Sequence, residues 1–499
     1  MHDYQREDSE FFKRTPFALG IIGLGLGKTV TTATTIADLL EDWDHVGKVL
    51  VIGPIPIVMN SWHDEVREWS HLAHLAPDMI TLRESDDDPR IKAAGKRAKM
   101  AGESPGKAET AMRQKIRHEL AASSKSIHMI NFEGLEWLIE YWGPRWPYRT
   151  VVVDESSMLK DHTSNRFKRL ASIRRDCAGA ITRLILLTGT PASESYMGLF
   201  SQVYLLDLGE RFGSSITNFQ RRYFYQDRYS QKWKLRPGAE EEILAKIADL
   251  VTIRESKGHE AHVIRRFVNL SDDELNLYKR MQKDFIVQLP EGHIVEAKNA
   301  AALSQKLTQL SSGVLYETAI EMDPDADDPE EADRIKVTRV HKIHDHKIAE
   351  LKSILEELDG QSVLVAYQHK SSKDRILKAF PKAVLWHKSG RDKPAWNAGK
   401  IKMMLMHPKS GGHGNNLQKG GHIVVFFDIP WSREQFSQLV GRLARQGQEC
   451  EVSVILIVAK GTIDETMARA QREKEMNEEK LYEILKRLID GIRRKRRSS

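Results

Sequence analysis

The sequence has few cysteines and no long apolar run. Only Cys177 and Cys450 occur in 499 residues, so neither a disulfide framework nor a thiolate zinc site can be built from them alone. No apolar stretch reaches the roughly eighteen residues of a membrane-spanning helix, and the first residues lack a basic-then-apolar secretory signal. We therefore expect a reducing, cytoplasmic compartment and no membrane partner.

The chain is rich in charge, which is unevenly distributed. Hydrophobic residues make up 40% and charged residues 29%, and the net charge is +6. Residues 89–125 and 493–497 are basic, whereas 321–333 holds eight acidic residues. The basic regions suit a polyanion such as DNA; the alternative is that they are solvated faces or tails. The length predicts roughly three domains, or two large ones with insertions.

The most informative stretch is GIIGLGLGKT at residues 20–29. It follows an apolar segment at 17–22 and precedes residues 30–40, whose apolar side chains have helical spacing. A strand, a glycine-rich turn, Lys-Thr and a helix are the order of a phosphate-binding loop. The strict G-x-x-x-x-G-K-[ST] pattern is not met, because Ile22 stands at its first glycine. An ordinary glycine-rich turn with a chance Lys-Thr pair is the alternative.

Each residue of this loop has an expected role. Gly25 and Gly27 let backbone N–H groups face phosphate oxygens, and the helix N-terminus favours negative charge. Lys28 can reach the β and γ phosphates, and the Thr29 hydroxyl can bind Mg²⁺.

Apolar runs alternate with helical segments in both halves of the chain, which predicts an α/β fold with parallel sheets. The predicted strands are 17–22, 48–52, 126–130, 150–153 and 183–187, then 362–367, 383–386, 402–406, 422–427 and 452–458. The predicted domains are a first lobe at 1–207 with a basic insertion at 83–125, a mostly helical module at 208–345 with a disordered acidic loop at 321–335, a second lobe at 346–462, and a long helix with a basic tail at 463–499.

Other polar residues follow predicted strands. Asp154 and Glu155 end the run Thr-Val-Val-Val, where a carboxylate can bind Mg²⁺ and its neighbour can orient or deprotonate water. Thr188 follows the next strand. Near the start, Tyr4 and Gln5 can meet an adenine edge, although an ordinary surface glutamine is the alternative.

Two arginines in the second half are three residues apart. On a helix Arg442 and Arg445 would face the same way and suit developing phosphate charge; exposed arginine pairs are also common on helices. Three histidines, at 341, 344 and 346, suggest a metal site, but the favoured interpretation is a solvated helix start before residues 347–358.

The ordered set of motifs resembles superfamily-two helicases, and within them the Swi/Snf-like DNA translocases. The matching segments are 25–29, 51–69, 128–132, 154–160, 188–191, 362–368, 410–417, 438–448 and 461–465. Trp62, Trp69 and the pair Gly447-Gln448 point to the Swi/Snf branch. The compact size resembles phage or bacterial members, which places the protein in bacterial or phage-infected host cytoplasm.

The resemblance implies two RecA-like lobes with a helical insertion between them and a C-terminal helix, with ATP and Mg²⁺ between the lobes. The implied catalytic residues are Lys28, Asp154, Glu155, Arg442 and Arg445. The implied nucleotide-binding residues are Tyr4, Gln5, Gly25, Gly27, Lys28, Thr29 and Gly414, with Thr29 and Asp154 on the metal. The implied contacts to the DNA backbone are Pro54, Asn60, Thr188, Gly412 and Asn416.

The expected function is ATP-dependent movement along duplex DNA, remodelling protein–DNA complexes or forked and branched DNA. Backbone contacts predict salt-sensitive binding without sequence preference. A strand-separating helicase and a DNA-binding subunit that uses ATP only as a switch are the alternatives. The second is favoured by two departures from the family pattern, Ile22-Gly23-Leu24 before the loop and Ser157 in place of a frequent histidine. We expect a monomer; accessory protein partners stay open.

Overall fold

The computed structural model divides the described chain into two compact units, residues 1–254 and 261–471. It describes residues 1–23, 25–41, 47–55, 57–84, 88–176, 179–189, 196–226, 233–254, 261–289, 293–322, 334–387, 389–409, 416–445 and 447–471, without the side chains of 300, 318–322 and 334–337. No helix in these ranges is long and apolar enough to cross a membrane.

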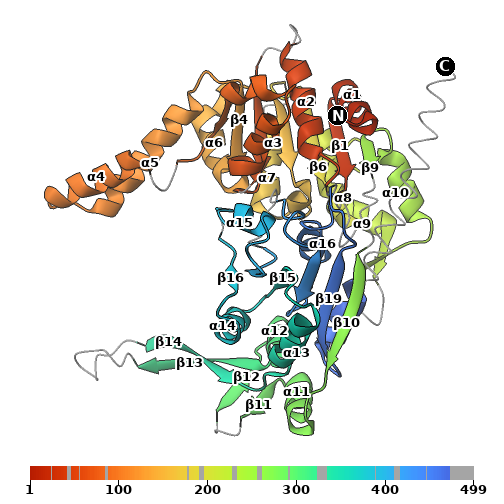
Figure 1. Cartoon of the computed structure of the whole chain (residues 1–499). Coiled ribbons are helices and arrows are strands. Elements are labelled where there is room, and N and C mark those ends of the chain that lie inside the picture. The colour runs from red at the N-terminus through yellow and green to blue at the C-terminus, as the bar shows by residue number, and fades with distance from the viewer. Residues whose placement is uncertain are drawn as a thin grey trace. The chain divides into compact units, whose positions relative to one another are not determined.

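The first unit is built on a parallel sheet of seven strands in the order β3-β4-β2-β5-β6-β1-β9 (Figure 1). The strands are β1 (Phe17–Ile22), β2 (Lys48–Gly53), β3 (Met79–Thr81), β4 (Ile127–Asn131), β5 (Tyr148–Asp154), β6 (Arg183–Thr188) and β9 (Val251–Arg254). Alternate residues of β1 enter opposite cores, Leu19 and Ile21 on one face and Ala18 and Ile22 on the other, as expected where helices cover both faces.

Helices of the first unit cover both faces of this sheet. All the helices of this unit, including α4 and α5, which project from it, are α1 (Asp3–Arg14), α2 (Lys28–Glu41), α3 (Trp62–Glu68), α4 (Pro89–Met100), α5 (Pro105–Ala121), α6 (Leu135–Trp142), α7 (Asn165–Asp176), α8 (Met197–Asp207), α9 (Ile216–Tyr223) and α10 (Ala239–Ile247) in the part described, beside a short pair β7 (Phe224–Gln226) and β8 (Trp233–Leu235). Side chains from α2 and α3 pack in one core, and those from α6, α7 and α8 pack in the other.

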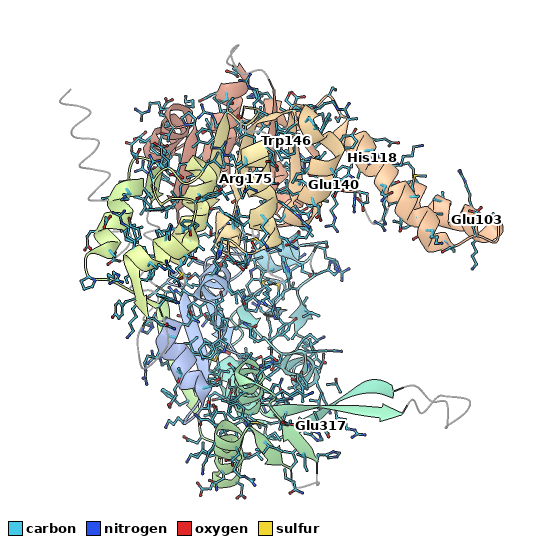
Figure 2. All side chains as sticks on the ribbon, turned by 180° about the vertical axis from the view of Figure 1, so that it is seen from behind. Glu103, His118, Glu140, Trp146, Arg175 and Glu317 are labelled. Carbon is cyan, nitrogen blue, oxygen red and sulfur yellow. The ribbon has the colours of Figure 1, made fainter. Side chains whose placement is uncertain are left out.

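The predicted insertion forms a two-helix arm, α4 and α5, that projects from the first unit (Figure 1). Figure 2 shows Glu103 at its far end and His118 near its base. His118 stacks on Trp137 with ring centroids 5.8 Å apart, and Arg117 pairs with the buried Glu84 at 2.7 Å. These contacts fix the base of the arm and leave its far end exposed.

The second unit has a parallel sheet of six strands in the order β10-β19-β18-β15-β17-β16. Its strands are β10 (His262–Val268), β15 (Val363–Ala366), β16 (Val384–Leu385), β17 (Met403–Met406), β18 (Ile423–Phe426) and β19 (Ser453–Ala459). The helices are α11 (Asp272–Asp284), α12 (Ala300–Ser311), α13 (His346–Glu357), α14 (Lys370–Ala379), α15 (Lys393–Asn397) and α16 (Arg433–Val440). Two antiparallel pairs complete it, β11 (Ile286–Gln288) with β12 (Ile294–Glu296), and β13 (Val314–Met322) with β14 (Arg334–Lys342).

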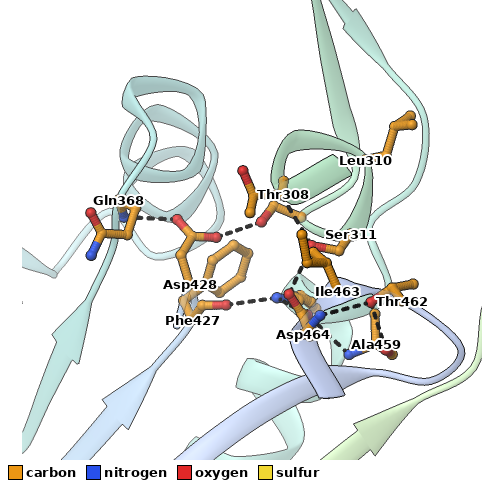
Figure 3. Close-up of polar contacts among 12 residues, drawn as sticks. Thr308, Leu310, Ser311, Gln368, Phe427, Asp428, Ala459, Thr462, Ile463 and Asp464 are labelled. Atoms are coloured by element: carbon orange, nitrogen blue, oxygen red, sulfur yellow. Dashed lines mark hydrogen bonds and ion pairs between the residues drawn. The ribbon is translucent and has the colours of Figure 1, made fainter. Parts of the chain in front are cut away.

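A buried polar network ties α12 to this second sheet (Figure 3). Ser312 Oγ donates to Asp428 Oδ1 at 2.6 Å, and Ser311 Oγ donates to Asp464 Oδ1 at 2.8 Å. The fully buried Lys347 pairs with Asp464 at 2.7 Å and donates to the Phe427 carbonyl at 3.0 Å. Buried charges need such partners, so this network fixes α12 and α13 within the second unit.

The predicted strands are all present, with ends shifted by up to two residues, but three edge strands of the two sheets, β3, β9 and β10, and the antiparallel pairs were not predicted. The division of the chain also differs from the predicted one. Residues 208–254 belong to the first unit, because β9 pairs with β1, whereas residues 261–345 belong to the second, because β10 pairs with β19. The region 208–345 therefore does not form one mostly helical module.

Both ends of the predicted acidic loop are ordered strand. Glu321 pairs with Ile335 and Met322 with Arg334 at the end of β13–β14, so the prediction of disorder was wrong at these positions, and residues 323–333 lie outside the described part. The predicted C-terminal helix begins at Ile463 and is described to Gln471, and its remainder with the basic tail also lies outside.

Candidate functional site

The glycine-rich loop leaves β1 at Ile22 and enters α2 at Lys28. Gly25 and Gly27 have φ angles of 81° and 77°, a backbone region that glycine adopts without a steric penalty. Lys28 Nζ donates to the Ile22 carbonyl at 3.1 Å, so its side chain folds back across the loop. The loop therefore presents a half-buried ammonium at the N-terminus of a helix, a combination that suits phosphate.

The predicted residues Tyr4 and Gln5 lie directly on this loop. The Tyr4 hydroxyl and Gln5 Nε2 both donate to the Leu26 carbonyl, each at 3.3 Å. Gln5 is 2% exposed, so it is not an ordinary surface glutamine. A Cβ placed on Gly27 would collide with the Gln5 amide and would approach Val30 Cγ1 to 2.8 Å. Gly27 therefore permits the close approach of α1 to the loop.

Arg254, at the end of β9, holds α1 in this position. Its guanidinium pairs with Asp8 at 3.0 Å and with Glu7 at 2.8 Å, and donates to the Tyr4 carbonyl at 3.4 Å. Burial, followed by the Asp8 carboxylate, raises the pKa of Tyr4, so the hydroxyl stays protonated at neutral pH. The edge strand that sequence analysis missed thus positions the predicted adenine-facing residues.

The two predicted carboxylates follow β5 at the same edge of the sheet. Because Leu187 of β6 pairs with Asp154 on one side and with Gly20 of β1 on the other, Asp154 lies about 10 Å, or two strand spacings, from Gly20. Asp154 and Glu155 are 3% and 5% exposed. Trp62 Nε1 donates to Asp154 Oδ2 at 3.0 Å, and the Glu155 N–H donates to Asp154 Oδ1 at 3.0 Å.

Glu155 has a φ angle of 60°, in the left-handed region that non-glycine residues seldom occupy. Such strain is concentrated at functional sites. It places Glu155 at the turn between β5 and the following 3₁₀ helix, Ser156–Leu159. The carboxylate therefore comes from a turn whose backbone is fixed by tertiary structure.

The donors at this edge fit a magnesium nucleotide. Thr29 offers a half-buried hydroxyl in the first turn of α2, and Asp154 offers a carboxylate. Mg²⁺ prefers such hard oxygen donors and keeps several waters and phosphate oxygens. The positive-φ glycines and the helix start supply the complementary phosphate cradle. The residue types and their common sheet edge thus match ATP with Mg²⁺.

The turn after Glu155 is bonded to α8. Ser156 Oγ donates to Gln202 Oε1 at 2.8 Å, and Ser201 Oγ donates to the Lys160 carbonyl at 2.9 Å. Ser157 is 2% exposed within the same turn. Side chains on both sides of Ser157 therefore connect the carboxylate turn to the helix that follows β6.

The predicted DNA contacts of the first unit differ in exposure. Pro54 is half-buried and Asn60 is exposed in a π-helical turn, Ile57–Ser61, after β2; such turns are frequent at functional sites. Thr188, in contrast, is fully buried at the end of β6. Its side chain is enclosed in the first unit as described, and its contact with DNA stays a prediction.

In the second unit the predicted residues Asn416 and Arg445 bond to each other, through Asn416 Oδ1 and Arg445 Nη1. Arg445 Nε also donates to the Gly441 carbonyl at 2.7 Å. The predicted helix through both arginines is wrong, because α16 ends at Val440 and the chain continues in turns. Arg442 is consequently 3% exposed while Arg445 is only half-buried. Gly412 and Gly414 lie outside the described residues.

Of the histidines flagged in the sequence, His346 begins α13 with a 39% exposed side chain, whereas His341 and His344 do not belong to a solvated helix start. His344 is 5% exposed and shares a hydrogen bond of 3.0 Å with the Leu310 carbonyl, whereas His346 contacts Glu274 at 2.8 Å. Burial, followed by His346, lowers the pKa of His344 to about 4. His344 is therefore a neutral core residue, and His341 has different partners.

Comparison with known proteins identifies the family of the chain. The family model for the SNF2-related domain matches residues 22–318, more than half of the chain. The chain belongs to the SNF2-related family. It carries the SNF2-type ATPase core of superfamily two, and the resemblance drawn from the motifs is confirmed.

Relatives of this SNF2-related chain include a protein of similar length. "Putative protein p41" of Acyrthosiphon pisum secondary endosymbiont phage 1 is 32% identical over 480 residues, covering 93% of this chain and 94% of that protein. The "CHD3-type chromatin-remodeling factor PICKLE" of Arabidopsis thaliana is 24% identical over 508 residues. This chain spans 34% of the length of PICKLE. The solved "Sulfolobus solfataricus SWI2/SNF2 ATPase core in complex with dsDNA" is 16% identical, with 97% of this chain and 94% of that chain covered and a TM-score of 0.40.

Two residues of the SNF2-related core, Trp62 and Gln448, make buried contacts that were not predicted from the sequence. Trp62 was noted only as a mark of the family, yet it bonds to Asp154. Gln448 is 7% exposed and its amide donates to the carbonyls of Gln418 and Gly421 at 3.0 and 3.1 Å. It thereby joins the segment after Arg445 to the segment after Asn416. Both residues lie in segments that match the family motifs and carry an N–H donor, and this is the only feature of the sequence that could have suggested such contacts.

Proposed function

We propose that this SNF2-related chain is an ATP-dependent translocase that moves along duplex DNA and remodels protein–DNA complexes or forked and branched DNA. One observation carries the proposal. The phosphate loop, Asp154 and Glu155 lie at the carboxyl edge of one parallel sheet, and Gln5 contacts the loop. This arrangement suits hydrolysis of a nucleoside triphosphate whose base is recognised by Gln5.

We assign different side chains of the first unit to different roles in ATP hydrolysis. We assign Lys28 to the β and γ phosphates and Gly25 and Gly27 to the backbone cradle. Thr29 and Asp154 would hold Mg²⁺, which neutralises phosphate charge when bound. We assign the buried Glu155 to orient or deprotonate the attacking water.

Arg442 and Arg445 of the second unit are assigned to transition-state charge, as the family pattern suggests. An arginine can stabilise the charge that develops on phosphate oxygens. Arg445 suits this role better, because it is less buried and its Nε and Nη1 atoms are already oriented by Gly441 and Asn416. Gly414 stays a predicted nucleotide contact.

Contacts to DNA are assigned to the backbone rather than to bases. Asn60 and Pro54 follow β2 in the first unit, and Gly412 and Asn416 are the predicted contacts of the second. The arm at Pro89–Ala121 supports a polyanionic partner, since it holds nine basic and three acidic residues, a net charge of +6. Lys96, Arg97 and Lys99 are exposed toward its far end. Such contacts make affinity fall with salt.

Displacement of a third strand tests translocation separately from strand separation. The full chain is incubated with ATP and a duplex that carries a triplex-forming strand, and in parallel with a forked duplex. We expect release of the third strand, abolished in Lys28→Ala, with the underlying duplex intact. Release of a duplex strand would favour the helicase alternative, and hydrolysis-independent binding with no release would favour the nucleotide-switched subunit.

A further inference from the structure

Three side chains of the second unit converge away from the arginine pair. His293 immediately precedes β12, Glu317 lies on β13 and His341 lies on β14. In the β13–β14 register Leu315 faces His341 and Glu317 faces Arg339, so Glu317 and His341 are diagonal neighbours on one face. Figure 2 shows Glu317 toward the end of this strand pair that joins the rest of the unit.

One carboxylate oxygen serves both imidazoles. Glu317 Oε2 lies 2.8 Å from His341 Nε2 and 3.1 Å from His293 Nδ1. The ligand atoms of all three residues lie within 4.8 Å of one another. The Glu317 and His341 side chains are 13% and 10% exposed, whereas His293 is 33% exposed. The cluster is thus mostly enclosed, with one side open to solvent.

We propose that His293, Glu317 and His341 bind a divalent transition-metal ion of the zinc type. Two imidazole nitrogens and one carboxylate oxygen are a known donor set for zinc, with water in the fourth position. Zinc bonds of about 2.0–2.2 Å at tetrahedral angles separate donor atoms by about 3.3–3.5 Å. The distances from Glu317 Oε2 to His341 Nε2 and to His293 Nδ1 need to widen by only about 0.2–0.7 Å, which side-chain rotation provides.

Ordinary hydrogen bonds are the competing account of this cluster. In that account each imidazole donates one N–H to Glu317, and no cation is needed. The hydrogen bond from His341 lowers the pKa of Glu317, and Arg339 contributes in the same direction. Lys306, whose Nζ donates to the Tyr316 carbonyl, also interacts with Glu317. Arg339 and Lys306 lie near the carboxylate, so their positive charge opposes a further cation at this position.

A metal at this position would join three segments that are distant in sequence. It would fasten the β11–β12 pair to β13–β14 at the base of the longer strand pair. Metal binding to a folded site adds to folding free energy. The inferred role is therefore a structural clasp in the second unit, and it is independent of the nucleotide chemistry proposed for the first.

Direct metal titration tests the clasp. The full chain is stripped with chelator, transferred to nucleotide-free buffer, and titrated with Zn²⁺ by calorimetry and with Co²⁺ by visible absorption. We expect one equivalent to bind, with visible Co²⁺ bands of a low-coordinate site, and a rise in the unfolding temperature of the second unit. His293→Ala and Glu317→Gln should each weaken binding by at least tenfold and abolish the temperature rise.

His346→Ala is the matched control, because His346 also contacts a glutamate, Glu274 at 2.8 Å, without a second histidine in that pair. The control should bind metal like the unaltered chain. Since His293 is the most exposed member, its variant should fold, and circular dichroism checks this. Absence of stoichiometric binding by the unaltered chain, or binding that survives both His293→Ala and Glu317→Gln, would overturn the proposal in favour of the hydrogen-bonded account.

Discussion

The two units present their predicted site residues in different ways. In the first, residues that are distant in sequence meet at one sheet edge, where Gln5 contacts the loop at Leu26 and Trp62 contacts Asp154. In the second, Asn416 and Arg445 bond to each other, and Arg442 is buried. The first unit thus brings its predicted nucleotide-binding residues together, whereas the second holds an arginine oriented by its own neighbours. Substitutions in the two units should therefore have distinguishable effects.

Glu155→Gln is expected to have the largest effect on turnover. It keeps the shape of the side chain but removes a base, and loss of general-base catalysis costs on the order of 10²–10⁴-fold. ATP binding, measured with a fluorescent analogue, should change little. Glu140→Gln is the control, since Glu140 is exposed on α6 of the same unit (Figure 2). Near-normal turnover in Glu155→Gln would remove this residue from the proposed chemistry.

The arginine pair offers a comparison within the second unit. Arg445→Ala should lower turnover on the order of 10²-fold or more while ATP binding persists, because an arginine that acts on transition-state charge contributes little to ground-state binding. Arg442→Ala should lower turnover as well and, unlike Arg445→Ala, should also lower the unfolding temperature, because removal of its buried side chain leaves a cavity. Steady-state kinetics and thermal unfolding of both variants separate the roles. Equal kinetic and stability profiles would contradict the distinction.

Trp62→Phe tests whether the indole positions Asp154. Loss of one hydrogen bond to a charged group costs about 1.5–3 kcal/mol, so turnover at limiting Mg²⁺ should fall about tenfold or more and recover partly at high Mg²⁺. Trp69→Phe is a close control, because its indole donates to Glu65 at 3.3 Å in the same segment. If both variants behave alike, the Asp154 contact has no special importance.

His128 in the first unit and His344 in the second are buried, and their lowered pKa values predict a pH effect on stability. Burial, followed by Lys48, lowers the pKa of His128 to about 4, and His344 in the second unit has a similarly lowered pKa. The ordinary pKa is about 6.5, so the unfolded chain binds protons that the folded chain does not. The contribution of each histidine to the free energy of unfolding is fully present above pH 6.5. It decreases as the pH falls toward 4, by up to about 1.4 kcal/mol per pH unit for each histidine.

Hydrogen exchange read separately on peptides of the two sheets measures this effect. His128→Gln should flatten the pH dependence of the first unit only, and His344→Gln that of the second only. The exposed His74→Gln serves as the control. Unchanged pH profiles in both variants would show that other groups govern acid stability.

The sequence predicted the inner strands and the strand–turn–helix order around residues 20–29 well, because buried parallel strands read as continuous apolar runs. It did not predict the edge strands β3, β9 and β10; β3 has only three residues, and the side chains of β10 are largely exposed on alternate positions. The contact between Trp62 and Asp154 spans 92 residues, and the His293–Glu317–His341 cluster is assembled by strand register. A pattern within a short stretch of sequence predicts neither contact, because the residues are brought together by the tertiary fold. The orientation of Arg442 was mispredicted because α16 ends before it.

The most direct test of the central claim is the ATP hydrolysis rate without nucleic acid and with single-stranded, duplex or forked DNA. It is compared in the unaltered chain, in Lys28→Ala, and in Lys168→Ala, which removes an exposed lysine of α7. We predict strong stimulation by duplex or forked DNA in the unaltered chain and in Lys168→Ala, and none in Lys28→Ala. Little turnover under every condition, despite ATP binding, would contradict the motor and favour a nucleotide-switched DNA-binding subunit.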